Sequence, residues 1–189
     1  FKADTTFACN PGKIVFKNTS KSISSSCTWE LGDGFTWDGC SEFPYVYRKS
    51  GNYDVMLRVT DDRGCTDSLT KKDYIKIART PIAYFTIDPE NPTILHPDVQ
   101  FYDKSVGVIN KWSWNFAGYA GSNRQNPKYT FPESAKDKYM VKLEVTDTNS
   151  CVGDTLISVF VGPEFSFYIP NAFSPNGDGL NDVWKPVGN

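Results

Sequence analysis

The 189-residue sequence is 39% hydrophobic and 15% aromatic, which is enough apolar material for packed cores and excludes wholesale disorder. The formal net charge is −2, from 20 basic and 22 acidic residues, so the chain has no basic field that would hold a nucleic acid. The longest apolar runs, such as residues 159–161, are far too short to cross a bilayer.

The first part of the chain has the pattern of short strands joined by turns. Turn residues gather in the strings NPGK, LGDG, KSGN and DDRG. In YDVMLRVT, Tyr53, Val55, Leu57 and Val59 alternate with residues of the other face, which is typical of a half-buried strand. We expect strands near residue 1 and at residues 14–18, 27–31, 44–47, 53–60 and 66–77.

The second part of the chain repeats the first. The strings IVFKNTS (14–20), CTWELGDG (27–34) and YDVMLRVTDDRGC (53–65) recur as VQFYDKS (99–105), WSWNFAGY (112–119) and YMVKLEVTDTNSC (139–151). Matched positions, such as Trp29 and Trp114, are 85 or 86 residues apart. Three matches in the same order indicate an internal duplication, and each copy has the size of a small sandwich domain.

We therefore predict an all-β chain built from two tandem antiparallel β-sandwiches, since no ten-residue window keeps a helical period. The expected domains are residues 1–79 and 80–163, followed at 164–189 by a linker and the first residues of a further β-domain. The predicted core residues are Phe16, Trp29, Tyr53, Phe101, Trp114 and Tyr139.

These residues resemble the polycystic kidney disease (PKD) family of immunoglobulin-like domains. The pattern V-x-F-x-x-x-S, W-x-F/L-G-D-G and G-x-Y-x-V-x-L-x-V-x-D is matched by IVFKNTS, WELGDG and GNYDVMLRVTD in the first copy. The second copy departs from the pattern, because WNFAGYAG replaces the Gly-Asp-Gly loop and Lys138 stands where the glycine before the tyrosine would be. The resemblance covers about residues 1–162 and implies an immunoglobulin-like fold, with a remodelled loop after Trp114.

Five cysteines indicate an oxidising, exported setting. If residues 32–35 form a four-residue hairpin loop, Trp29 faces Asp38 and Cys27 faces Cys40, which predicts a Cys27–Cys40 disulfide. A register shifted by one residue would bury Trp37 instead and would break this pairing.

The three remaining cysteines allow two arrangements. Cys9 and Cys65 are expected at opposite ends of one sandwich, about 26 Å apart along the strand between them. In an end-to-end stack, Cys9 would instead reach Cys151 of the second copy, and Cys65 would bond to an upstream repeat. The alternative is Cys9–Cys65 with Cys151 free.

No catalytic arrangement emerges from the sequence, and we expect a protein that is not an enzyme. His96 is the single histidine, no G-x-S-x-G motif occurs, and the serine-rich residues 18–27 have the composition of a polar loop. Aromatic residues in or beside loops are candidates for stacking on sugar rings or partner surfaces, chiefly Trp37 and Tyr119, with Trp112 and Tyr45 beside them. Packing at the edge of a sandwich or between domains is the alternative for these side chains.

The last part of the chain carries a second resemblance. The string FYIPNAFSPNGDGLNDVWKPVG (167–188) looks like the opening of the gliding-motility-associated C-terminal domain that directs proteins into type IX secretion. The resemblance implies a secretion signal recognised by the type IX machinery or by an outer-membrane shuttle or anchor protein. The positions that carry the motif are Pro170, Asn171, Phe173, Pro175, Asn176, Asp178, Asn181 and Asp182.

The same string has oxygen-bearing residues around two glycines. Asn176, Asp178 and Asp182, with Asn181 beside them, are candidate calcium ligands, and calcium is the one cofactor that the sequence suggests. No distal glutamate completes an EF-hand spacing, so an Asx-rich turn leading into the next domain is the alternative.

The two resemblances together imply a non-catalytic region of a large secreted adhesin on the bacterial cell surface, of the SprB-like gliding type. The repeats would act as spacers or adhesive modules that contact neighbouring repeats and surface polysaccharide. The chain opens at Phe1 without Met and stops in mid-pattern, and we interpret it as part of a longer protein. An accessory region of a secreted polysaccharide- or protein-degrading enzyme is the alternative.

Overall fold

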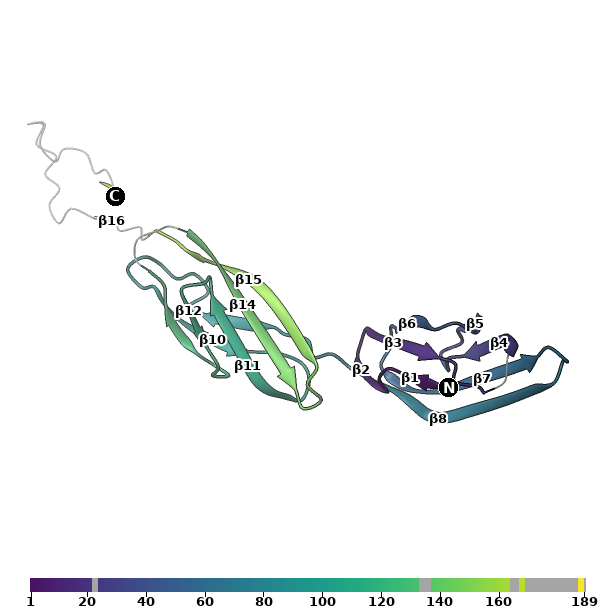
Figure 1. Cartoon of the computed structure of the whole chain (residues 1–189). Helices are drawn as coiled ribbons and strands as arrows, with labels where there is room; N and C mark the ends of the chain where they lie inside the picture. Colours follow the sequence, from purple (N-terminus) through teal and green to yellow (C-terminus); the bar gives the residue numbers. More distant parts are fainter. Residues whose placement is uncertain (22–23, 133–136, 164–166, 169–186, 189) are drawn as a thin grey trace, which may run out of the picture. The chain divides into compact units, whose positions relative to one another are not determined.

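The computed structural model describes residues 1–21, 24–132, 137–163, 167–168 and 187–188, and the regular elements among them are all β-strands (Figure 1). The predicted all-β class is confirmed. By their contacts the residues divide into two compact units. The first contains Phe1–Ala83, Ser105–Lys111 and Glu144–Gly153, and the second contains Tyr84–Lys104, Trp112–Leu143 and Asp154–Asn189. The domain limits at 79 and 163 stay a sequence-based prediction.

The first repeat is a sandwich of a three-stranded and a five-stranded sheet. The smaller sheet has the order β1-β3-β6, with β1 at Lys2–Ala3, β3 at Gly12–Lys17 and β6 at Phe43–Tyr47. The larger sheet has the order β2-β8-β7-β4-β5, with β2 at Phe7–Cys9, β4 at Ser24–Glu30, β5 at Thr36–Asp38, β7 at Gly51–Asp61 and β8 at Thr66–Ala78. Pairing is antiparallel except between β2 and β8.

The second repeat has the corresponding sheets. One has the order β13-β10-β9, with β9 at Phe85–Asp88, β10 at Asp98–Asp103 and β13 at Lys128–Thr130. The other has the order β12-β11-β14-β15, with β11 at Ile109–Phe116, β12 at Ala120–Ser122, β14 at Asp137–Asp147 and β15 at Val152–Val161. A two-stranded ribbon, β16 (Phe167–Tyr168) with β17 (Val187–Gly188), follows.

Two strands of the first repeat differ from the sequence-based prediction. The serine-rich segment is not wholly a loop, because β4 begins at Ser24 and pairs with β7 across a register shift between Ser24 and Ser26. Strand β2 was not expected. It is only three residues long and covers the edge of β8 in parallel, from the Phe7–Lys76 pair to the Cys9–Ala78 pair. A three-residue strand is too short to show a clear alternation of apolar and polar residues, so its position depends on its pairing with β8.

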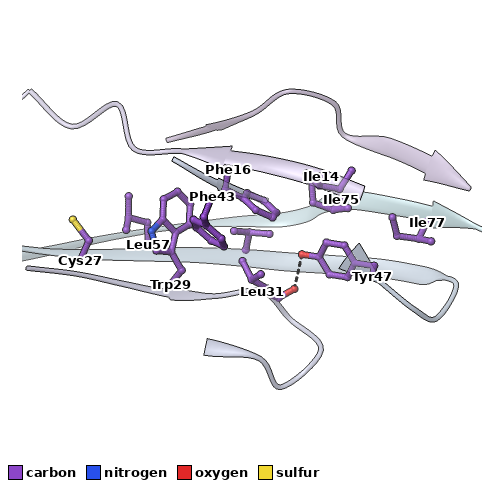
Figure 2. Packing of buried hydrophobic residues seen from close by; sticks show 11 residues of the cluster. Ile14, Phe16, Cys27, Trp29, Leu31, Phe43, Tyr47, Leu57, Ile75 and Ile77 are labelled. Atoms are coloured by element: carbon purple, nitrogen blue, oxygen red, sulfur yellow. Dashed lines mark hydrogen bonds between the residues drawn. The ribbon is translucent and has the colours of Figure 1, made fainter. Parts of the chain in front are cut away.

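The core of the first repeat gathers around a tryptophan. Trp29 is fully buried and has the rings of Phe1, Phe16 and Phe43 within 5.3–5.8 Å of its own, mostly edge to face (Figure 2). Its indole N–H donates to the Gly39 carbonyl at 3.2 Å, so the ring is buried without an unpaired donor. Ile14, Leu31, Val55, Leu57 and Ile75 complete the apolar layer.

The second repeat reproduces this arrangement. Trp114 lies against Phe85 at 5.1 Å and Phe101 at 5.4 Å, and its indole N–H donates to the Arg124 carbonyl at 2.9 Å. Tyr139 is buried there, whereas Tyr53 of the first repeat is half-exposed and belongs to the rim of its core. Two sequences with few identical residues thus bury the same ring at the same point of the fold.

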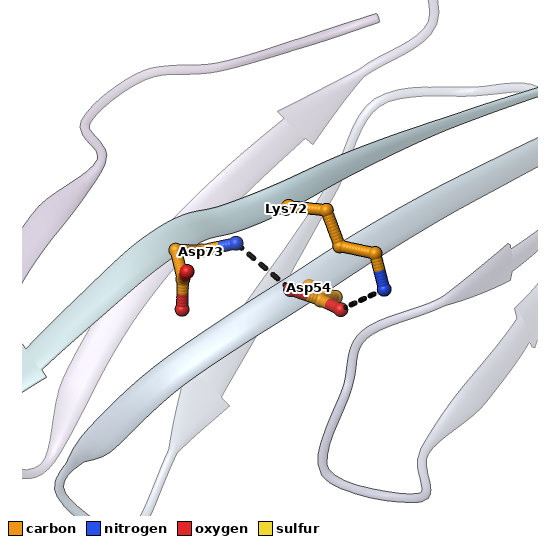
Figure 3. A network of polar contacts seen from close by, with 3 residues as sticks. All are labelled: Asp54, Lys72 and Asp73. Atoms are coloured by element: carbon orange, nitrogen blue, oxygen red, sulfur yellow. Dashed lines mark hydrogen bonds and ion pairs between the residues drawn. The ribbon is translucent and has the colours of Figure 1, made fainter.

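A bulge interrupts the long β7–β8 ladder. The register shifts between Tyr53 and Val55, and Asp73 on the opposite strand adopts a φ of 46°. The Asp54 carboxylate braces the bulge, since it accepts the Asp73 backbone N–H at 2.8 Å and the Lys72 ammonium at 2.6 Å (Figure 3). The Lys72 hydrogen bond, followed by the Asp73 N–H, lowers the pKa of Asp54. The bulge directly follows Tyr53, whose side chain also lines a groove of the first repeat.

Candidate binding grooves and disulfides

The first hairpin cross-link joins Cys27 to Cys40, with their Cα atoms 5.0 Å apart. The register that suggested this bond is wrong, because Trp29 lies opposite Trp37 and Thr28 lies opposite Asp38. The bond forms nevertheless because β5 ends at Asp38. The Gly39 N–H donates to the Cys27 carbonyl at 2.8 Å, and beyond this point the strand alternation no longer constrains Cys40.

The second disulfide joins Cys9 to Cys151, which are 142 residues apart in the chain and 5.6 Å apart at their Cα atoms. Of the two arrangements left open by the sequence, the structure contains this one. Cys9 pairs with Ala78 at one end of β8, and Cys65 precedes the other end. The 13 residues of β8 span about 40 Å, so a Cys9–Cys65 bond is out of reach.

Cys65 occupies the first-repeat position that matches Cys151. Of the five cysteines, all of which lie in the described part of the chain, Cys65 alone is unpaired, and it is exposed. The two cysteines lie in equivalent turns, one in each repeat. The Asp61 carboxylate accepts the Cys65 N–H at 2.8 Å, and the Asp147 carboxylate accepts the Cys151 N–H at 2.8 Å.

The Gly-Asp-Gly loop of the first repeat shapes a groove, which we call the Tyr45 groove. Gly32 and Gly34 have φ values of 84° and 92°, a conformation that favours glycine. Between them, Asp33 accepts the Phe35 N–H at 3.1 Å and the Tyr45 hydroxyl at 2.6 Å. The groove has a volume of about 430 Å³ and is lined by Asp33, Tyr45, Val46, Arg48, Lys49 and Tyr53.

Aromatic rings form a continuous row beside this groove. Phe35 stacks on Tyr45 at 4.6 Å, Tyr45 meets Tyr47 edge to face at 4.9 Å, and Tyr47 contacts Tyr53 at 4.4 Å. The Tyr47 hydroxyl donates to the Leu31 carbonyl at 2.9 Å, and the Tyr53 hydroxyl donates to the Lys49 carbonyl at 2.7 Å (Figure 2 shows the Tyr47 bond). The row is therefore held rigidly along one side of the Gly-Asp-Gly loop.

The electrostatics of the Tyr45 groove keep its phenols neutral. Burial, together with the hydrogen bond to Asp33, raises the pKa of Tyr45 to about 12 from the ordinary value of 10.0. Burial and the Asp33 charge also raise the pKa of Tyr53. The positive charge of Arg48 acts in the opposite direction on the pKa of Tyr45. The groove thus offers aromatic rings, one carboxylate and two cations.

The second repeat has a different groove, which we call the Tyr119 groove, with a volume of about 500 Å³. Tyr119 is 66% exposed and meets Tyr139 edge to face at 6.0 Å. Gly118 stands where the first repeat has Asp33, so the carboxylate is missing. The remaining lining includes the exposed apolar side chains of Met140 and Leu156.

The two aromatic residues singled out as ligand contacts thus differ. Tyr119 lies in a groove, but Trp37 stacks on Phe43 at 3.9 Å and packs against the core. Of the other two candidates, Trp112 donates its indole N–H to the Asp103 carboxylate at 2.7 Å, and Tyr45 belongs to the groove described above. The sequence signal for the Tyr45 groove was the alternation of aromatic residues at positions 43, 45 and 47 next to the Gly-Asp-Gly loop.

The described residues offer no metal site, since no three His, Cys, Asp or Glu side chains among them gather to hold an ion. The candidate calcium ligands Asn176, Asp178 and Asp182 and the proposed secretion residues from Pro170 to Asp182 lie outside the described residues. Within the described part of the chain, no helix is long and apolar enough to span a membrane.

Residues 7–77 match the model of the PKD domain. This match supports the resemblance of the first repeat to the PKD family. Similar solved structures include the PKD1 domain of Vibrio anguillarum Epp, with 20% identity over 45% of this chain and 96% of that chain and a TM-score of 0.38. The PKD1 domain of the Vibrio cholerae metalloprotease PrtV has 22% identity over 44% of this chain and 98% of that chain, also with a TM-score of 0.38. Both TM-scores are low, so these two structures add nothing to the family match.

Proposed function

We propose that this chain is a non-catalytic, exported repeat region that serves as a spacer and adhesive module on the bacterial cell surface. The observation that carries the proposal is the Cys9–Cys151 bond, which joins the PKD domain to the last turn of the second repeat. Disulfides persist in oxidising compartments, and a bond that closes a loop of this length strongly restricts the unfolded chain. Such a cross-link suits a module exposed to proteases and shear.

Neighbouring repeats are the first class of partner. Because Cys151 receives a bond from Cys9, the matching Cys65 is the position at which a preceding module of the same build would attach. The fit would differ in one detail. Gly153 leaves room for the Pro81 carbonyl, whereas Asp67 at the matching position carries a side chain. The linker of the preceding module would therefore follow a different path past the turn at Cys65.

Export through type IX secretion is the second element of the proposal. It is supported by the resemblance of residues 167–188 to the gliding-motility-associated domain and by the disulfides. The machinery, or an outer-membrane shuttle or anchor protein, would read the residues from Pro170 to Asp182. The parent protein would be an SprB-like adhesin, and calcium would bind, if at all, at Asn176, Asp178 and Asp182.

The proposal is tested on whole cells that express the parent protein. Surface biotinylation with a membrane-impermeant reagent should label it, and a strain without the type IX translocon should retain it unlabelled in the periplasm. Peptide mapping without reductant should recover Cys9 with Cys151 and should recover Cys65 with a cysteine of another repeat. Reduced thiols at Cys9 and Cys151 and an unlabelled protein in wild-type cells would contradict export.

An accessory region of a secreted enzyme is the second candidate. The metalloprotease PrtV contains a PKD domain, which gives this setting a precedent in another protein. The parent sequence distinguishes the two, because further repeats favour the adhesin and a catalytic domain favours the enzyme. Either parent would use these two repeats as spacers.

A further inference from the structure

We propose that the Tyr45 groove binds acidic polysaccharide, with a uronic acid residue stacked on its aromatic rim. This inference deepens the adhesive role proposed above and rests on it. It assigns the contact to the first repeat, to a surface other than Trp37 and Tyr119, the residues that the sequence favoured.

The shape of the groove suits a sugar ring. Tyr45 and Tyr53 line it, and Phe35, which is 41% exposed, extends the flat surface by stacking on Tyr45. The apolar C–H face of a pyranose packs against such rings, and rings already fixed by hydrogen bonds lose little entropy on binding. The hydroxyls of Tyr45 and Tyr53 are fixed by Asp33 and by the Lys49 carbonyl.

The charges of the groove select the class of sugar. Arg48 and Lys49 are both exposed, and within the described part of the chain neither has a carboxylate at ion-pair distance. Asp33 is the one carboxylate of the lining, and its oxygens already accept the Phe35 N–H and the Tyr45 hydroxyl. Two cations with free donors beside an aromatic surface fit a sugar carboxylate, which arginine binds in bidentate fashion.

The Tyr119 groove provides an internal contrast. Two lysines line it, Lys138 and Lys142. Lys142 forms an ion pair with Asp154 at 3.2 Å, Lys138 also has an interaction partner, and the floor is apolar at Met140 and Leu156. It lacks the combination of a polar loop, a ring platform and two available cations. We therefore expect acidic sugars to bind the first repeat and not the second.

The test measures binding of the full chain to trigalacturonate and to cellotriose, a neutral trisaccharide, by isothermal titration calorimetry. We expect binding of the acidic sugar alone. The double variant Arg48→Gln/Lys49→Gln should weaken it at least about tenfold, because two charge-assisted contacts are lost. Phe35→Ala should weaken it less, since only the outer ring is removed. The control is Arg58→Gln, which removes one positive charge from an exposed position of β7 away from the groove.

Each outcome decides the inference. No binding of trigalacturonate, equal binding of cellotriose, or binding unchanged in the Arg48→Gln/Lys49→Gln variant would overturn it. An equal loss in Arg58→Gln would show a general charge effect and would also overturn it. Thermal melting of every variant verifies that the fold is intact. Failure here leaves the surface-labelling experiment unaffected, so loss of the groove assignment and loss of the proposed export are told apart.

Discussion

Each repeat has one turn before its last long strand. These two turns have the same backbone hydrogen bonds, but only one of their cysteines forms a disulfide. In each, the aspartate N–H donates to the cysteine carbonyl at 3.0 Å, and the aspartate carboxylate accepts the cysteine N–H at 2.8 Å. Even the residue with positive φ recurs, as Gly64 in one turn and Ser150 in the other. Yet Cys151 is buried and bonded to Cys9, whereas Cys65 is an exposed thiol.

The comparison teaches that local sequence determines the turn but not its role. Aspartate at the first position fixes the backbone through an Asx-type turn in both repeats. Whether the cysteine is then buried depends on the segment that meets it, and within the described part of the chain Cys65 of the first repeat's turn stays exposed.

The strongest test of equivalence replaces the central tryptophans. Trp29→Ala and Trp114→Ala should each destabilise the chain by about 3–5 kcal/mol, because each leaves a large cavity and an unpaired carbonyl at Gly39 or Arg124. Urea denaturation, followed by circular dichroism and the remaining tryptophan fluorescence, measures both. If one variant lost less than about 1 kcal/mol, the two cores would not be equivalent.

The two disulfides close loops of very different length. Replacing Cys9 and Cys151 by Ala removes a loop of 142 residues, for which the chain-entropy model gives about 5 kcal/mol. Replacing Cys27 and Cys40 removes one of 13 residues, for which it gives about 3 kcal/mol. Urea melts of both double variants check the order. A smaller loss for the Cys9/Cys151 pair would mean that residual contacts in the unfolded state outweigh loop length.

The sequence predicted the parts of this molecule that depend on periodicity. Alternation located the long strands, and the buried positions of Trp29 and Trp114 followed from it. The register of the first hairpin was wrong because two registers one residue apart differ only in whether Asp38 or Trp37 faces Trp29. The Tyr45 groove could not be predicted as a site, since it requires the loop at Asp33 and the bulge at Tyr53 to lie on the same side of the sandwich.

A smaller effect is expected where the loops diverge. Gly32 has a φ of 84°, and a Cβ there would lie 2.5 Å from the Asp54 carbonyl oxygen. Gly32→Ala should therefore cost about 1–3 kcal/mol. Ala117, the matching residue, adopts a φ of 52° with its Cβ already in place, so Ala117→Gly should be neutral or should stabilise by up to about 1 kcal/mol. Thermal melts of the two variants measure the difference, and equal effects would show that the loops are not under different strain.

The smallest effect concerns pH. The pKa of Tyr45 is raised to about 12, so the folded state favours the neutral phenol. This contribution to stability is complete below pH 10, the ordinary pKa of tyrosine, and is lost as the pH rises toward 12. Tyr45→Phe keeps the ring stacked on Phe35 but removes the titrating hydroxyl and its bond to Asp33. At pH 7 the variant should melt about 2–4 °C lower than the unchanged chain, because one exposed hydrogen bond is lost.

Above pH 10 the two melting curves should converge, since the unchanged chain loses the contribution that the variant already lacks. Tyr129→Phe is the matched control in the second repeat. Burial and Tyr119 raise the pKa of Tyr129, whose ring stacks on Phe116 at 4.4 Å, without a carboxylate among the causes. At pH 7 its melting temperature should therefore differ less from that of the unchanged chain than the melting temperature of Tyr45→Phe does, because no bond to a carboxylate is lost. Since the pKa of Tyr129 is also raised, this smaller difference should shrink above pH 10 as well. A Tyr45→Phe curve that stays parallel to the unchanged chain from pH 7 to pH 12 would mean that burial and Asp33 do not hold the phenol in its neutral form.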